Sequence, residues 1–164
     1  MKKLFLLFAL ALTATFSKAQ TTPNITNIPP YRICTTDSVY VTPANLKKNK
    51  PVVIIYFAPD CGHCQHLMYE MKPKMKEFGD AQIVMITFTD FTMLPAIKTF
   101  YNDFGLSKYP NITVGTEGHT YIVQRYYEVE TTPYIAVYNR KGKLVKAFAK
   151  APSVDELIAT VKKG

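Results

Sequence analysis

Cysteine and tryptophan are scarce in this sequence. Its 164 residues include three cysteines and no tryptophan. A structural zinc site needs two pairs of ligands. Cys61 and Cys64 make one pair, but the other candidates, Cys34, His66 and His119, are not spaced as a second. The pattern argues against structural zinc, and we expect neither a metal nor another cofactor.

Long apolar runs are missing, apart from one near the start. Residues 4–16 are mostly apolar and follow a basic start, and small residues at 17 and 19 suit a cleavage site before Gln20. Because the run is too short to span a bilayer, it predicts a secretory signal peptide over residues 1–19. No cysteine follows closely, which argues against a lipid anchor. We expect an exported mature protein without a membrane span.

Acidic residues are fewer than basic ones. Twelve aspartates and glutamates stand against twenty lysines and arginines, giving a formal net charge of +8. The lysines are scattered, and the densest group, residues 47–50, precedes an apolar run as a solvated loop would. A nucleic-acid-binding domain would gather its basic residues on one face. We therefore expect no nucleic-acid partner.

The chain is organised around the motif Cys61-Gly62-His63-Cys64. The apolar run 52–57 leads into it, residues 58–60 break that run, and a helical pattern follows to about residue 78. A thiol at a helix N-terminus meets unpaired N–H groups and the positive end of the dipole, which stabilise its thiolate. The second cysteine lies one turn on and can attack a mixed disulfide formed at the first. The motif predicts a redox site, whereas a purely structural disulfide would close too short a loop to add much stability.

The remaining patterns predict one α/β domain without repeats. Residues 20–30 are expected to be an extended, poorly ordered lead-in, and residues 31–42 a strand or hairpin. Strands are expected at 52–57, 83–88, 133–138 and 143–149, with a turn at 139–142 and a loop at 107–118. Helices are expected at 62–78, kinked by Pro73, at 92–102 capped by Thr92, at 120–127, and to 162 from a capping box at Ser153. This order predicts a central mixed β-sheet flanked by helices.

Residues 56–64 and 127–133 carry a family resemblance. The first segment holds the cysteine motif, and the second, Tyr127-Glu128-Val129-Glu130-Thr131-Thr132-Pro133, matches the pattern Y-x-V-x-x-T-P. Together they resemble the thioredoxin-like fold, over a domain that we place at residues 31–164. The resemblance implies that Pro133 is cis and faces the cysteines, and that the backbone of Thr132 pairs with an extended substrate segment. The alternative is a trans proline that starts an edge strand.

The signal peptide, the leading strand and the long interval between Cys64 and Pro133 are similar to exported thiol–disulfide oxidoreductases of bacterial envelopes. The dipeptide Gly62-His63 resembles protein disulfide isomerases instead, but the chain ends without a retention signal for the endoplasmic reticulum. The resemblance implies a periplasmic or envelope location. It also implies protein dithiols or disulfides as partners, with an upstream membrane-bound or soluble thiol reductant or oxidant.

The motif departs from the family at two positions. Many members have a buried carboxylate six residues before the first cysteine, where this chain has Ile55, and a tryptophan just before that cysteine, where it has Asp60. Proton transfer is therefore expected to rely on water or on Asp60, whose carboxylate opposes the Cys61 thiolate. His63 can favour the thiolate as a cation or a hydrogen-bond donor. The alternative is a solvent-facing His63 with little effect.

The predicted mechanism is thiol–disulfide exchange, in which Cys61 attacks and Cys64 resolves the mixed disulfide, in a direction that stays open. Cys34 is expected to be a buried, inert strand residue, with a third redox thiol as the alternative. A peroxiredoxin-like peroxidase would need threonine or serine at Ala58. A copper-handling protein could use His119 but usually has wider cysteine spacing, and a binding module with an inert cysteine pair stays open.

Overall fold

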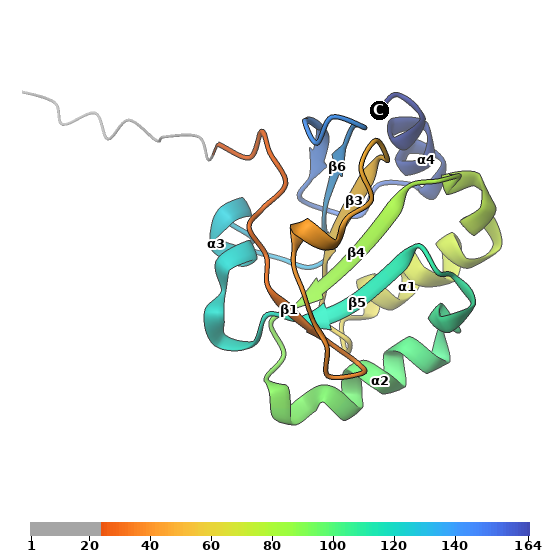
Figure 1. The fold of residues 1–164 in the computed structure, drawn as a ribbon. Helices are drawn as coiled ribbons and strands as arrows, with labels where there is room; N and C mark the ends of the chain where they lie inside the picture. Colours follow the sequence, from red (N-terminus) through yellow and green to blue (C-terminus); the bar gives the residue numbers. More distant parts are fainter. Residues whose placement is uncertain (1–23) are drawn as a thin grey trace, which may run out of the picture.

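The computed structural model describes residues 24–164, so the expected signal peptide lies outside the described residues. One mixed sheet runs through them in the order β2-β1-β5-β4-β3-β6-β7 (Figure 1). Its strands are β1 (Ile33–Thr35), β2 (Tyr40–Val41), β3 (Val52–Tyr56), β4 (Gln82–Thr87), β5 (Ile112–Thr116), β6 (Tyr134–Tyr138) and β7 (Leu144–Phe148). β3, β4 and β5 are parallel, and the other pairings are antiparallel. The predicted mixed sheet and its N-terminal hairpin, β1–β2, are confirmed.

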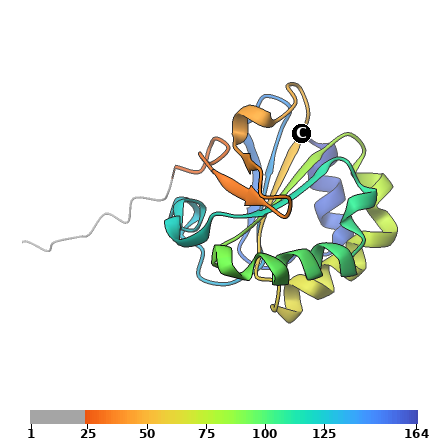
Figure 2. The same ribbon diagram turned by 60° about the horizontal axis from the view of Figure 1, so that its bottom comes forward.

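Helices cover both faces of the sheet. They are α1 (Gly62–Met71), α2 (Leu94–Asp103), α3 (Ile122–Tyr127) and α4 (Val154–Lys162). α1, α2 and α4 pack on one face, and α3 lies on the other with the start of the described chain (Figure 2). Alternate residues of β3 serve the two cores, with Val53 and Ile55 on the first and Ile54 and Tyr56 on the second. Of the helices in residues 24–164, none is long and apolar enough to cross a membrane.

The helix after the cysteine motif is split where Pro73 predicts a kink. α1 ends at Met71, and a tighter 3₁₀ segment, Lys72–Phe78, continues in its direction with Pro73 in its first turn. A proline lacks the N–H that the helical ladder needs, so the regular pattern stops just before it. Met68 and Met71 on α1 and Met75 on the 3₁₀ segment still face the same core.

The expected loop over residues 107–118 is wrong, because it contains the strand β5. β5 lies between β1 and β4 in the sheet. Pro110 precedes the strand and Gly115 lies inside it, and both residues are usual signals for a loop. A Cβ on Gly115 would lie 2.7 Å from the carbonyl oxygen of Cys34. The glycine therefore permits the close approach of β1 and β5, instead of ending a strand.

Two helix starts differ in detail from their predictions. Asp90, not Thr92, caps the turn before α2, because its Oδ1 accepts a hydrogen bond of 2.7 Å from the Thr92 N–H. Ser153 caps α4 as predicted, its Oγ accepting from the Glu156 N–H at 3.2 Å. The carboxylate of Glu156 is 2.7 Å from the Lys146 ammonium. The serine of the predicted capping box therefore makes its hydrogen bond, while the glutamate side chain pairs with Lys146 of β7 instead.

The described part of the lead-in is extended, as expected, but it is not loosely held. Thr26 accepts a backbone hydrogen bond of 2.9 Å from the Leu144 N–H. The Tyr126 hydroxyl donates to the carbonyl oxygen of Asn27 at 2.6 Å. These bonds tie the segment to β7 and α3. The described residues of the lead-in therefore lie along the domain and are hydrogen-bonded to it.

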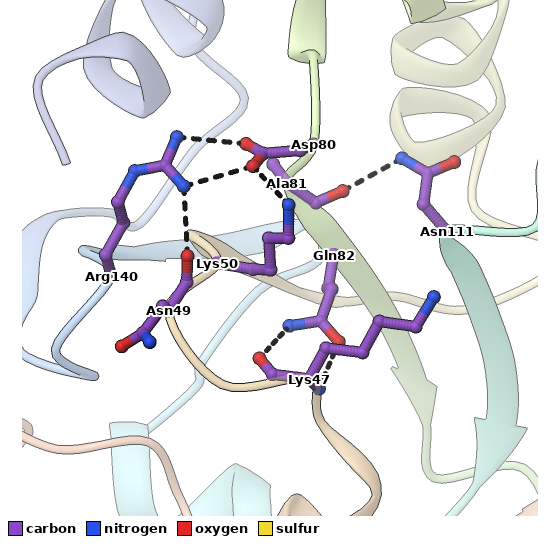
Figure 3. A network of polar contacts seen from close by, with 8 residues as sticks. All are labelled: Lys47, Asn49, Lys50, Asp80, Ala81, Gln82, Asn111 and Arg140. Carbon is purple, nitrogen blue, oxygen red and sulfur yellow. Dashed lines mark hydrogen bonds and ion pairs between the residues drawn. The ribbon is translucent and has the colours of Figure 1, made fainter.

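Charged and amide side chains tie together the end of the sheet where β3 and β4 begin. Asp80 binds both Lys50, at 2.6 Å, and Arg140, at 3.0 Å (Figure 3). The Gln82 side chain pairs with the backbone N–H and carbonyl of Lys47. Because β3 starts at this end, the network lies opposite the edge from which the chain enters the cysteine motif. The network therefore has a structural role: it holds together the end of the sheet that lies opposite the cysteine motif.

Candidate active site

Cys61 and Cys64 lie where β3 gives way to α1, as predicted. Cys61 is the N-cap of α1, and its carbonyl oxygen accepts a hydrogen bond of 3.0 Å from the Gln65 N–H. Cys61 is partly exposed, whereas Cys64 is buried against the helical core with 2% exposure. Both are free thiols. Cys61 is therefore open to a partner protein, while the Cys64 sulfur is shielded.

The two thiols differ strongly in acidity. Partial burial raises the pKa of Cys61, but hydrogen bonds with the side chains of Thr132 and Cys64 and with the backbone of Cys64 and His63 outweigh it, so this pKa lies below its ordinary value. Burial is the largest cause that raises the pKa of Cys64 to about 12, and its hydrogen bond with Cys61 adds to the effect. One site thus holds a thiolate-forming cysteine beside a cysteine that keeps its proton.

The Thr132–Pro133 segment lies against the motif. The peptide bond between these residues is cis, as the family resemblance implies. The carbonyl oxygen of Thr132 is 3.4 Å from the Cys61 sulfur. Pro133 is buried, and β6 begins at the next residue. The structure therefore brings together Cys61, Thr132 and Pro133, which are far apart in the sequence.

Gly62 and His63 form the outer part of the motif. His63 is exposed and lines a hollow of about 380 Å³ together with residues 131–133 and Lys150. A Cβ on Gly62 would meet no heavy atom within 4 Å, so the fold itself does not require glycine there. His63 therefore reaches the surface on the Pro133 side of the site, in a hollow that it shares with the cation Lys150, which sequence reasoning missed.

The buried carboxylate of the family is absent from the face that holds Cys64. Ile55 is fully buried at that position, and Asp60 is exposed beside Cys61. Within residues 24–164, the one fully buried carboxylate belongs to Glu117. It lies on the α3 side of the sheet and accepts hydrogen bonds from the Tyr56 hydroxyl and the Val123 N–H, each 2.8 Å. Glu117 anchors the start of α3, and its partners belong to the core on the other side of the sheet from Cys64.

Cys34 lies in β1 with 5% exposure, paired with Thr116 of β5 and Tyr40 of β2. It has neither a helix N-terminus nor a neighbouring cysteine. We expect Cys34→Ala to leave disulfide-exchange rates within about twofold of the wild type, because no group there activates a thiol. We also expect a free energy of unfolding lower by about 1 kcal/mol, from lost packing. Insulin-reduction rates and urea titrations measure the two effects, and a tenfold loss of turnover would make Cys34 a redox partner.

The other histidines lie on the surface, each beside a carboxylate. His66 is 3.5 Å from Glu70 on α1, and His119 Nε2 is 2.5 Å from Asp90. In the described part of the chain, no three side chains of histidine, cysteine, aspartate or glutamate lie together as a metal-ligand set.

The aromatic residues around Asp60 were also missed by sequence reasoning, because nothing in their spacing along the chain marks them.

Comparison with known proteins places this geometry in a family. A model of the thioredoxin-like domain matches residues 44–164. A search of curated proteins found no match.

Several solved structures share the fold. A secreted Mycobacterium tuberculosis disulfide oxidoreductase, homologous to E. coli DsbE, is 19% identical, with a TM-score of 0.65 over 82% of this chain and 96% of its own. The MTB protein dsbF is 21% identical, with a TM-score of 0.67 over 82% and 94%. A thiol-disulfide oxidoreductase from Bacteroides fragilis is 14% identical, with a TM-score of 0.65 over 81% and 97%. At these identities the structures share the fold, and the family model carries the assignment: the chain belongs to the thioredoxin-like domain family.

Proposed function

We propose that the protein is a thiol–disulfide oxidoreductase that exchanges disulfides with protein substrates through Cys61 and Cys64. The observation that carries this proposal is the contrast between the two thiols. Cys61 is partly exposed with a lowered pKa, and Cys64 is buried with a raised one. A thiolate is the nucleophile in exchange, and a protected second thiol at one turn can resolve the product.

The proposed reaction has two steps. The Cys61 thiolate attacks one sulfur of a substrate disulfide, the substrate S–S bond breaks, and the released thiolate takes a proton from water. Cys64 then gives its proton to water and attacks the Cys61 sulfur, the mixed disulfide breaks, and the second substrate sulfur leaves as a thiolate that takes up a proton from water. The substrate gains two electrons and the enzyme ends with a Cys61–Cys64 disulfide; the reverse sequence oxidises a dithiol. An upstream thiol reductant or oxidant, membrane-bound or soluble, completes the cycle.

The surroundings of Cys61 suit a protein substrate. The Thr132 backbone lies beside the sulfur, where an extended segment can pair with it as an added strand. Asp60 and His63 stand at the surface on either side of the thiol as modulators of its charge. We place this activity in the periplasm or cell envelope, supported by the signal-peptide pattern of residues 1–19. Solved relatives in fold include a protein described as secreted.

The reduction potential of the cysteine pair tests the function. Thioredoxin has a potential of about −270 mV and protein disulfide isomerase about −180 mV, and we expect this pair at roughly −190 to −250 mV. The low pKa of Cys61 stabilises the reduced form and raises the potential, while the Asp60 carboxylate opposes the thiolate and limits the rise. His63→Pro should lower the potential by roughly 30 mV, or about 1.4 kcal/mol, because a donor or cation is lost.

Equilibration against glutathione buffers at neutral pH measures both values. His66→Gln is the matched control, since His66 is an exposed histidine on the same helix that does not line the His63 hollow. A His63→Pro potential at or above the wild-type value would reject the role of His63. A pair that forms no reversible disulfide would overturn the proposed function, and a wild-type value near −120 mV would make the protein a dedicated disulfide donor.

A further inference from the structure

A groove passes the loop that enters the cysteine motif, and His63 is not among its described lining residues. It is made of two hollows of about 390 Å³ each, which share the lining residues Pro59, Asp60 and Ala96 and therefore adjoin each other beside the start of α1. One extends toward Phe88 and Met93, and the other extends between α1 and α2. We call the combined hollow the Asp60 groove. It begins one residue from the nucleophile.

Large apolar side chains are uncovered along the Asp60 groove. Tyr69 is 68% exposed, Met93 51% and Phe88 37%. All three line the groove, and they are half of the large exposed apolar residues among those described. Scattered exposed apolar residues need no explanation, but a group of them in a concave surface marks a place for a partner. Here the group adjoins a reactive thiol.

The charge of the Asp60 groove is opposite to that of the chain. Asp60, Asp90 and Asp103 line it, and none of its described lining residues is lysine or arginine. His119 also lines it and is paired with Asp90. The chain as a whole has a formal net charge of +8. An acidic rim on a basic protein favours a basic partner at this one place, because complementary charge steers association.

The hollow across the site has the other sign. It is lined by His63 and Lys150, and no carboxylate is among its described lining residues. A segment that crosses Cys61 therefore meets carboxylates and aromatic rings on one side and a cation on the other. A surface that bound every peptide equally well would not need hollows of opposite charge on the two sides of Cys61.

We propose that the Asp60 groove binds a segment of the substrate protein that carries lysine or arginine and an apolar side chain next to its reactive cysteine. This inference rests on the proposed thiol–disulfide exchange and names its class of substrate. The apolar side chain packs on the uncovered rings, and the basic side chain reaches the carboxylates on the rim. The backbone beside the cysteine remains free to pair with Thr132.

Paired disulfide peptides test the groove. Three peptides of equal length keep one apolar residue beside the cysteine and vary the flanking residues as Lys, Gln or Glu. We expect the reduced wild-type protein to exchange the Lys peptide about tenfold faster than the Glu peptide, measured as kcat/KM at low salt. Raising the salt to about 0.5 M should compress this ratio, because screening weakens exposed charge pairs.

The charge-reversal variant Asp103→Lys identifies the surface. Asp103 lies at the end of α2, away from the thiol, so it separates binding from the acidity of Cys61 better than Asp60 does. We expect Asp103→Lys to reduce the Lys-to-Glu ratio to about threefold or less. Asp37→Lys is the matched control, since Asp37 is exposed in the β1–β2 turn and lines neither hollow. It makes the same change of charge and should keep the ratio.

The outcomes separate the groove from the function. If the Gln peptide is exchanged but the Lys and Glu peptides react equally fast, the groove proposal is overturned and the oxidoreductase stands. An equal loss of the ratio in Asp103→Lys and Asp37→Lys would also overturn it, because net charge would then explain the preference. If no peptide is exchanged, the proposed function itself fails.

Discussion

Cys64→Ser is expected to hold substrate proteins on Cys61 as stable mixed disulfides. Cys61 remains partly exposed and keeps its hydrogen bonds with Thr132 and with the His63 backbone, which lower its pKa, while the thiol that would release the substrate is gone. A serine hydroxyl cannot attack a disulfide under these conditions, so the reaction stops after its first step. With insulin as the substrate, we expect at least about tenfold more adduct than with Cys61→Ser, because there the remaining thiol is buried and holds its proton.

Non-reducing electrophoresis followed by mass spectrometry measures the adducts and identifies the linked cysteine. Both variants are made in a Cys34→Ala background, so that the buried third thiol contributes to neither. Adducts should disappear on addition of dithiothreitol. Equal trapping by the two variants would contradict the assignment of Cys61 as nucleophile and Cys64 as resolving residue.

The redox site could be predicted because its parts are local in sequence. An apolar run, a break and a helical pattern fix where Cys61 and Cys64 lie, and the structure places both there. Thr132 and Pro133 are far away along the chain, and residue patterns alone leave Pro133 open to a trans edge-strand role. Only the family resemblance joined them to the cysteines, and the structure shows the cis bond and the contact with the Cys61 sulfur.

β5 could not be predicted because a contact with another strand, and not local propensity, determines which residue it has at position 115. Gly115 reads as a loop residue, yet the approach of the Cys34 carbonyl leaves no room for a side chain. The start of α2 was missed for a similar reason, since Asp90 and Thr92 are both good capping residues and only the backbone path chooses between them. Local propensity cannot rank such choices before the neighbouring elements are in place.

The Asp60 groove was invisible to sequence reasoning because its residues come from separate segments. Asp60 and Tyr69 belong to the motif and α1, Met93 to the turn before α2, and Asp103 to the end of α2. No spacing relates them. The absence of a buried carboxylate near Cys64 could be predicted at Ile55, but only the structure shows that Glu117 serves the other face.

Selective alkylation of Cys61 is the expected result of the contrast in acidity between the two thiols. With a pKa of about 12, about one Cys64 thiol in a hundred thousand is ionised at pH 7. The pKa of Cys61 lies below its ordinary value, so its thiolate is far more abundant than that of Cys64 at this pH. The more basic Cys64 thiolate is intrinsically more reactive, which offsets part of this advantage. Cys61 is still expected to react much faster, and the burial of Cys64 adds to the difference.

Iodoacetamide labelling of the reduced Cys34→Ala protein, followed by mass spectrometry of its peptides, measures the two rates from pH 5 to pH 10. The rate at Cys61 should rise with pH and level off below the ordinary thiol range, because a lowered pKa means that the thiolate forms at lower pH. Cys64 should stay unlabelled until far higher pH. Cys61→Ser is the control: it removes the Cys61 sulfur that accepts the hydrogen bond from Cys64 but does not change the burial of Cys64, so Cys64 should remain slow. Comparable labelling of both cysteines at pH 7 would show that burial does not protect the Cys64 proton, and the division of roles between the two thiols would fail with it.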